Sequence, residues 1–264
     1  MADILVVGAT GTTGRRVAAG LRDRGVRPRL ASRRPRDGHV RFAWSDRSTY
    51  AAALRGVDTV YLIAPPAELD AATLAADFLS AGDLRRVVVL GSSAVPDLAG
   101  VPGLVKEKVP EWAVLRPSWF MQNFTGDHPV ARGVRAGEIV TATGDGRLGF
   151  VDARDIAAVA VRALTSDEPP NTEYVLTGPE TLSYADAAAI IAAATGRPVR
   201  HRPVGVAELV DLLTAELPPA YAQMLAALDT RIQAGHEDYV TSTIEQVTGR
   251  PPRDFRSFVA EELR

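Results

Sequence analysis

Three glycines at three-residue spacing constrain this chain more than any other feature of its sequence. Gly8, Gly11 and Gly14 join the apolar run ILVVG (residues 4–8) to the amphipathic segment TGRRVAAGLRDRG (13–25). A glycine-rich turn between a strand and a helix lets the backbone approach a pyrophosphate closely, and the helix N-terminus presents free N–H groups to the phosphate charge. We therefore predict a dinucleotide-binding loop, with added hydroxyl contacts from Thr10, Thr12 and Thr13.

The residues after the second expected strand indicate which dinucleotide binds. An NAD site carries Asp or Glu about 20 residues beyond the loop, where the carboxylate accepts from the ribose hydroxyls. This chain reads LASRRPRDG (30–38) instead and places Ser32, Arg33 and Arg34 there. Two guanidinium groups pair well with a 2′-phosphate, so the sequence favours NADP(H) over a pair of arginines that only solvate a strand end.

Short β-branched runs alternate with helical stretches over the first 120 residues. Strands are expected at 4–8, 27–33, 39–44, 57–66, 85–93 and 112–118, and helices at 13–25, 47–56 and 68–82. This alternation predicts βαβ units, and therefore an α/β fold with a doubly wound parallel sheet of the Rossmann type. By analogy with that fold, further cofactor contacts are expected from Asp46, Ala64, Pro65 and Ser92.

The pattern changes after residue 120. Residues 138–151 predict two short strands around a glycine-rich turn, and residues 152–166 predict a helix that begins near Asp152 and Asp155. Residues 172–204 predict a strand, a capped helix that ends at a glycine, and a second strand, and the last sixty residues are mostly helical. We interpret residues 1–125 as an NADP-binding Rossmann domain with segments returning from 138–176. Residues 126–264 are then mainly a smaller, mixed α/β substrate lobe that does not fold independently.

Composition excludes several classes of protein. The net charge of -2 gives no sign of a nucleic-acid partner, and no apolar stretch is long enough to span a bilayer. The chain has no cysteine, which excludes disulfides and Cys-ligated zinc, and no metal site is expected. We expect a cytoplasmic monomer or homodimer that acts on a small-molecule substrate.

Ordinary short-chain dehydrogenases reduce carbonyls with a proton from a tyrosine four residues before a lysine. None of the six tyrosines in this chain has lysine at that position: Tyr50, Tyr61, Tyr174, Tyr184, Tyr221 and Tyr239. A ketone that accepts hydride becomes an alkoxide, so a positioned acid speeds its reduction by roughly 10²–10⁴-fold. An iminium becomes a neutral amine, and a quinone becomes a stabilised hydroquinone anion. The missing pair therefore favours imine/iminium or quinone reduction, and it does not choose between them.

Four segments of the sequence resemble the NmrA-like family of atypical short-chain dehydrogenases/reductases. They are GATGTTGRRV, EWAVLRPSWFMQNF, ATGDGRLGFVDARDIAAVAVRALT and YVLTGPETLSYADAAAIIAAATGRPV. The family includes NADPH:quinone oxidoreductases of the second type and isoflavone-reductase-like enzymes. LRPSWFMQNF followed by GDGRLGFVDARDIA is most similar to the branch with the ergot-alkaloid reductases, which reduce an iminium intermediate.

The resemblance implies roles for particular residues. It assigns the glycine loop to the pyrophosphate, Ser32 with Arg33 to the adenosine phosphate, and Pro117, Trp119 and Phe120 to the surroundings of the nicotinamide. Many relatives keep a lysine after the fifth strand, near the positions of Lys106 and Lys108.

The candidate catalytic and substrate residues come from the carboxyl edge of the sheet and from the second half of the chain. Ser92 ends the fifth strand, where its hydroxyl either orients substrate or caps a turn, and His128 lies in a loop, where it either donates a proton or has no role. The catalytic candidates are therefore Ser92, Lys106 and His128. The candidate substrate residues are Trp119, Phe120, Phe124, His128, Tyr221 and Met224. Trp119, Phe120, Met121 and Phe124 also have helical spacing, and at least two of them are expected to be core residues.

The sequence thus predicts an NADPH-dependent reductase of an imine/iminium or quinone-type acceptor. Two alternatives stay open. One is a non-enzymatic NADP(H)-binding sensor of the NmrA type that controls a protein partner. The other is an ordinary ketone reductase with an unusual proton donor.

Overall fold

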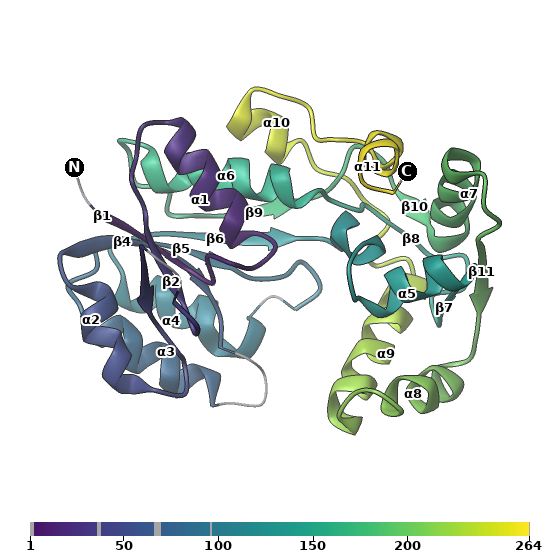
Figure 1. Cartoon of the computed structure of the whole chain (residues 1–264), viewed down its shortest axis with the longest axis horizontal. Helices are drawn as coiled ribbons and strands as arrows, with labels where there is room; N and C mark the ends of the chain where they lie inside the picture. Colours follow the sequence, from purple (N-terminus) through teal and green to yellow (C-terminus); the bar gives the residue numbers. More distant parts are fainter. Residues whose placement is uncertain (1–2, 36–37, 66–69, 96, 264) are drawn as a thin grey trace. The chain divides into compact units, whose positions relative to one another are not determined.

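The main sheet of the protein has seven strands, and every neighbouring pair is parallel. In the computed structural model, which describes residues 3–35, 38–65, 70–95 and 97–263, the strand order is β3-β2-β1-β4-β5-β6-β9 (Figure 1). The strands are β1 (Asp3–Val7), β2 (Arg29–Ser32), β3 (His39–Arg41), β4 (Val57–Ile63), β5 (Arg86–Leu90), β6 (Glu111–Pro117) and β9 (Thr172–Leu176). This confirms the predicted doubly wound α/β fold.

Helices cover both faces of this sheet (Figure 1). One face carries α1 (Gly14–Asp23), α6 (Ala153–Thr165) and α10 (Thr243–Thr248), and the other carries α2 (Tyr50–Leu54), α3 (Ala71–Ser80) and α4 (Val101–Lys108). In α1 the residues Val17, Ala18 and Leu21 are buried, as their helical spacing requires. The strand order reverses beside β1, where β2 lies on one side and β4 on the other, and open α/β sheets bind ligands at such a point.

The chain forms two compact units. The first contains the residues up to Pro117, together with 153–176 and 243–250, and the second contains 118–152, 177–242 and 251–264. Within the second unit, β7 (Glu138–Thr141) pairs in parallel with β11 (Arg200–Pro203), and β8 (Arg147–Leu148) pairs antiparallel with β10 (Leu182–Ser183). Its helices are α5 (Pro129–Ala136), α7 (Tyr184–Thr195), α8 (Val206–Thr214), α9 (Pro219–Gln233) and α11 (Phe255–Glu262).

Aromatic side chains form the core of the second unit. The rings of Phe124, Phe150, Tyr184 and Phe255 contact one another at centroid distances between 4.9 and 6.0 Å. Beside them the fully buried carboxylate of Asp152 accepts from Gln122 at 2.9 Å and from Arg253 at 2.8 Å. Asp152 therefore has the structural role expected from its sequence position.

Two helices were not predicted from the sequence. These are α4 and α5, and each carries proline within its first two residues, where the missing N–H costs nothing. Three short 3₁₀ helices, Arg47–Thr49, Leu98–Gly100 and Met121–Phe124, also join the longer elements. The helix predicted over 68–82 is α3, and Glu68 and Leu69 lie outside the described residues.

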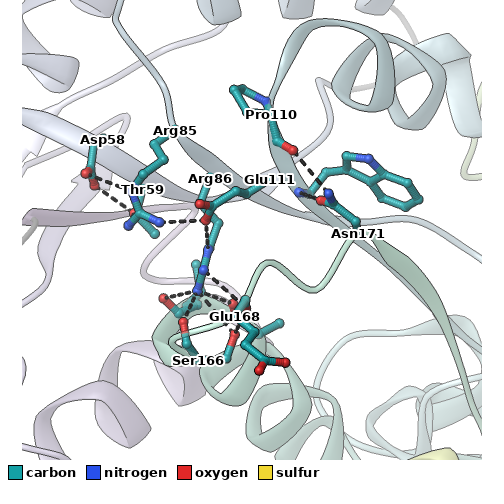
Figure 2. Close-up of polar contacts among 12 residues, drawn as sticks. Asp58, Thr59, Arg85, Arg86, Pro110, Glu111, Ser166, Glu168 and Asn171 are labelled. Carbon is teal, nitrogen blue, oxygen red and sulfur yellow. Dashed lines mark hydrogen bonds and ion pairs between the residues drawn. The ribbon is translucent and has the colours of Figure 1, made fainter.

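A buried arginine fastens the end of α6 to the sheet in the first unit. Arg86 opens β5, its side chain is 2% exposed, and its Nε donates to Glu111 at 2.6 Å (Figure 2). Its terminal nitrogens donate to the carbonyl oxygens of Ala163 at 3.1 Å, Ser166 at 2.6 Å and Glu168 at 3.3 Å. Carbonyl groups at a helix C-terminus lack intrahelical donors and carry partial negative charge. The guanidinium supplies the missing donors and a positive charge that offsets the partial negative charge.

Replacing this arginine should therefore destabilise the protein far more than replacing its neighbour. Arg86→Met leaves the carbonyl groups after α6 without donors, and we expect the free energy of unfolding to fall by about 3–5 kcal/mol. Arg85 pairs with Asp58 and Glu111 at the surface, so Arg85→Met should cost at most about 1 kcal/mol. Urea denaturation of both variants measures the difference, and equal losses would contradict the role given to Arg86.

Candidate functional site

The glycine loop has a geometry that tolerates no side chain at two of its three glycines. Gly8 has φ +70°, a conformation that favours glycine. A Cβ on Gly14 would lie 2.2 Å from the carbonyl oxygen of Gly8, whereas a Cβ on Gly11 would meet only that oxygen, at 3.2 Å. Gly8 and Gly14 thus allow α1 to begin directly against the end of β1, and Gly11 leaves the outer side of the loop bare.

The start of α1 presents unused hydrogen-bond donors. The N–H groups of Thr12, Thr13 and Gly14 donate to no acceptor within the described residues, and no side chain caps the helix. The Thr13 hydroxyl is buried and accepts from the Tyr61 hydroxyl at 2.8 Å, so it anchors the loop to β4. Thr10 is exposed. Free N–H groups at a helix N-terminus fit a pyrophosphate, so these residues suit the predicted dinucleotide.

The two arginines after β2 are also unengaged. Ser32 is buried, and its hydroxyl donates to the carbonyl oxygen of Arg34 at 3.0 Å, which holds the turn. Arg33 and Arg34 are exposed, and neither guanidinium has a hydrogen bond or ion pair in the described part of the chain. Their charges are therefore available to an anionic group.

Three further residues predicted to contact the cofactor follow strands β3 and β4. Asp46 accepts from Ser48 and pairs with Arg41 at 3.1 Å, and these contacts hold the pKa of its carboxyl below the usual value. After β4, Ala64 is half-buried and packs against the core, and Pro65 is buried. All three lie near the carboxyl edge of the sheet, as their sequence positions imply.

The two serines after β5 differ. Ser92 accepts from the N–H of Ala94 at 3.2 Å, which is a turn contact. The Ser93 hydroxyl is buried and has no hydrogen-bond partner among the described residues, although the Ser93 N–H donates to the carbonyl oxygen of the buried Pro117 at 3.0 Å. Ser93, rather than Ser92, has a hydroxyl that is unused within the chain.

Lys106 belongs to a cluster of ion pairs in the first unit. It lies on α4, pairs with Glu173 of β9, and its ammonium is 5.5 Å from the centre of the Trp112 ring. Arg116 also pairs with Glu173 at 2.7 Å, and the two cations hold the pKa of that carboxyl below its usual value. These contacts give Lys106 a structural role, and we leave it out of the candidate site.

The second unit contains a largely apolar pocket of about 520 Å³. Of the predicted substrate residues, Trp119 and His128 line it, together with leucines from α8 and α9. The structure does not bring four others to this pocket: Phe120 is half-buried, Phe124 lies in the aromatic core, and Tyr221 and Met224 are exposed on α9. The face of α9 that lines the pocket carries Leu225, Leu228 and Asp229 instead.

His128 precedes α5 and caps it. Its Nδ1 accepts from the N–H of Val130 at 3.2 Å, which a doubly protonated ring could not do. The ring reaches solvent, yet the surrounding protein atoms desolvate it and, with Arg132, hold the pKa of His128 below its usual value, while a backbone hydrogen bond with Asn123 opposes the shift. His128 is therefore a neutral hydrogen-bonding group at neutral pH rather than a charged acid.

Sequence reasoning missed two polar residues of this pocket. Asp229 accepts from the N–H of Ala142 at 2.8 Å, and burial raises the pKa of its carboxyl to about 6. The Tyr184 side chain also lines the pocket, and burial followed by the nearby Asp229 raises the pKa of its phenol. The segment AALDT contains the signal that could have identified Asp229, a single carboxylate on an apolar stretch of helix.

The described ranges contain no cluster of three or more His, Cys, Asp or Glu side chains that could hold a metal ion. No helix within them is both long and apolar enough to cross a membrane.

Comparison with known proteins gives relatives along nearly the whole chain, although no family model matches it. The oxidoreductase YesF of Bacillus subtilis is 44% identical over 268 residues, which cover 97% of this chain and 94% of YesF. Festuclavine synthase II of Penicillium roqueforti is 34% identical, over 98% of both chains. The quinone oxidoreductase QOR2 of Escherichia coli, solved with NADPH, shares the fold with a TM-score of 0.84, at 20% identity and over 99% of this chain and 100% of that one.

The sequence relatives are long enough and similar enough to establish the family. They agree with the parallel sheet, with the glycine loop and with the resemblance noted from the sequence. The chain belongs to the NmrA-like family of atypical short-chain dehydrogenases/reductases, and it is an oxidoreductase.

Proposed function

We propose that this protein is an NADPH-dependent reductase that delivers hydride to an imine/iminium or quinone-type small molecule. Two observations support the proposal together: the second unit has a largely apolar pocket of about 520 Å³, and the sequence has no tyrosine four residues before a lysine to act as the proton donor. An apolar pocket with a few polar groups suits an aromatic or polycyclic acceptor.

The first unit supplies the residues that would hold NADPH. The N–H groups of Thr12, Thr13 and Gly14 would bind the pyrophosphate, and Arg33 and Arg34 would bind the 2′-phosphate. When bound, NADPH supplies a hydride from its nicotinamide ring. The QOR2 structure with NADPH supports this cofactor, since the fold is shared over nearly the full length of both chains.

The state of the protonatable groups supports an acceptor that needs no strong acid. Burial raises the pKa of Tyr61 and Tyr184, the opposite of the change that an activated tyrosine requires. Lys106 is held by Glu173, and His128 is neutral at neutral pH. A ketone would leave an alkoxide with no evident donor, whereas an iminium or a quinone would not require one.

One structural neighbour and one relative bear on the two acceptor classes. QOR2 is named as a quinone oxidoreductase, and festuclavine synthase II supports the resemblance to the ergot-alkaloid branch noted from the sequence. The choice between the classes depends on the pocket of this chain.

The direct test is consumption of NADPH, followed by its absorbance, with a cyclic iminium, a benzoquinone and a simple ketone. We expect turnover with the iminium or the quinone and little with the ketone. Fast ketone reduction would contradict the proposal, and tight NADPH binding without turnover of any of the three would favour the sensor.

A side chain on the bare side of the loop should block the cofactor without unfolding the protein. We expect Gly11→Ala to raise the Kd for NADPH by about tenfold or more, because its Cβ takes the space left for the pyrophosphate. Gly103→Ala on α4 is the matched control, since its Cβ would make only ordinary contacts with Asp97. Calorimetric binding and the melting temperature test both, and unchanged NADPH affinity in Gly11→Ala would exclude the loop as the site.

The arginines after β2 should determine the preference for NADPH over NADH. In Arg33→Ala/Arg34→Ala we expect NADPH affinity to fall by roughly tenfold to a hundredfold, with NADH affinity changed by less than about twofold. Arg27→Ala, an exposed arginine just before β2, is the control and should leave both affinities unchanged. An equal loss for both cofactors would show that the arginines do not recognise the 2′-phosphate.

A further inference from the structure

The pocket of the second unit contains one carboxylate that no cation balances. Asp229 projects from α9, and its only hydrogen bond within the described residues is the one its Oδ2 accepts from the N–H of Ala142. No lysine, arginine or histidine in the described part of the chain forms an ion pair with it. The second oxygen of this carboxylate is therefore free to accept from a ligand.

The other ionisable groups that line the pocket are neutral or already paired. Arg132 of α5 pairs with Glu216, which follows α8, and Glu138 of β7 pairs with Arg200 at 2.7 Å and Arg202 at 3.0 Å. His128, before α5, is neutral at neutral pH, and Tyr184 of α7 keeps its proton. Asp229 thus supplies the unbalanced negative charge of this lining.

The surroundings of Asp229 make that charge costly. Leu209, Leu213, Leu225 and Leu228 line the same pocket, and a carboxylate among apolar side chains loses hydration that one N–H bond only partly replaces. Burial raises the pKa of Asp229 to about 6, so the group is still mostly ionised at neutral pH. A charge kept at such a position is compensated best by a cation that enters the pocket with its ligand.

We infer that Asp229 is the counter-ion for a positively charged nitrogen, and that the pocket binds hydrophobic organic cations in preference to neutral molecules of the same shape. Trp119, which lines the same pocket, adds an aromatic ring of the kind that attracts cations. The inference rests on the proposed function for the assignment of this pocket to the acceptor. It selects the iminium from the two acceptor classes.

Binding of a matched pair of probes tests this inference without turnover. The full chain, saturated with NADP⁺, is titrated calorimetrically at about pH 8 with N-methylisoquinolinium, a fixed cation, and with isoquinoline, which is neutral there. We expect the cation to bind at least about tenfold more tightly than isoquinoline. Lowering the pH to about 5 should weaken binding of N-methylisoquinolinium, whose charge does not depend on pH, because Asp229 becomes protonated.

Three variants assign the preference to the carboxylate. Asp229→Asn should bring the affinity ratio close to one, and Asp229→Glu should retain a preference for the cation. Glu180→Gln removes an equal charge from an exposed residue of the second unit that does not line the pocket, so its ratio should match that of the unmodified protein. Asp229→Asn should also melt no lower than the unmodified protein at about pH 8, because it removes a desolvated charge.

Each outcome is decisive. Equal affinity of the unmodified protein for the two probes overturns the inference, as does a preference that survives in Asp229→Asn. If Asp229→Asn does not fold, the probe ratio of the unmodified protein and of Asp229→Glu still decides. NADPH consumption with a quinone but no cation preference would retain the proposed function and reject this inference.

Discussion

The candidate cofactor site depends on the close approach of Gly14, the first residue of α1, to Gly8, which directly follows β1. With no side chain on Gly14, the helix begins against the carbonyl oxygen of Gly8, and the N–H groups of Thr12, Thr13 and Gly14 have no acceptor among the described residues. The buried hydroxyl pair of Thr13 and Tyr61 then fixes the loop to β4. Backbone geometry therefore builds the anion site before any charged side chain contributes.

Buried charge has two different roles in this molecule. In the first unit, the Arg86 guanidinium has a partner for every nitrogen, and it joins the end of α6 to the start of β5, away from the carboxyl edge of the sheet. In the second unit, the half-buried Asp229 has one backbone donor and no cation partner among the described residues. A buried charge whose partners are all supplied by the chain serves the fold. A buried charge whose partner is missing from the chain indicates a ligand.

The sequence predicted the helices and strands whose signals are local. It did not predict which side chains line the pocket, because that depends on the direction in which each side chain points. The glycine loop and the strands of the main sheet are encoded by turn glycines and β-branched runs, so both were predicted. On α9 apolar residues occur on more than one face of the helix, so spacing alone could not tell that Leu225 and Leu228 line the pocket while Tyr221 and Met224 are exposed. Phe124 lies in the aromatic core, which was the alternative left open from the sequence, because an aromatic residue near a predicted site fits a core as well as a pocket.

The missing proton donor and the unbalanced carboxylate have one explanation. A neutral carbonyl acceptor would require an acid and would gain nothing from a negative charge in the pocket. The proposed iminium acceptor carries its own positive charge, so it needs no acid to accept hydride, and the carboxylate of Asp229 would offset the cost of bringing that charge out of water. Hydride transfer would cancel the charge at the reacting carbon–nitrogen bond without a proton donor. On this proposal, the same pocket would both favour binding of the acceptor and make an acid unnecessary.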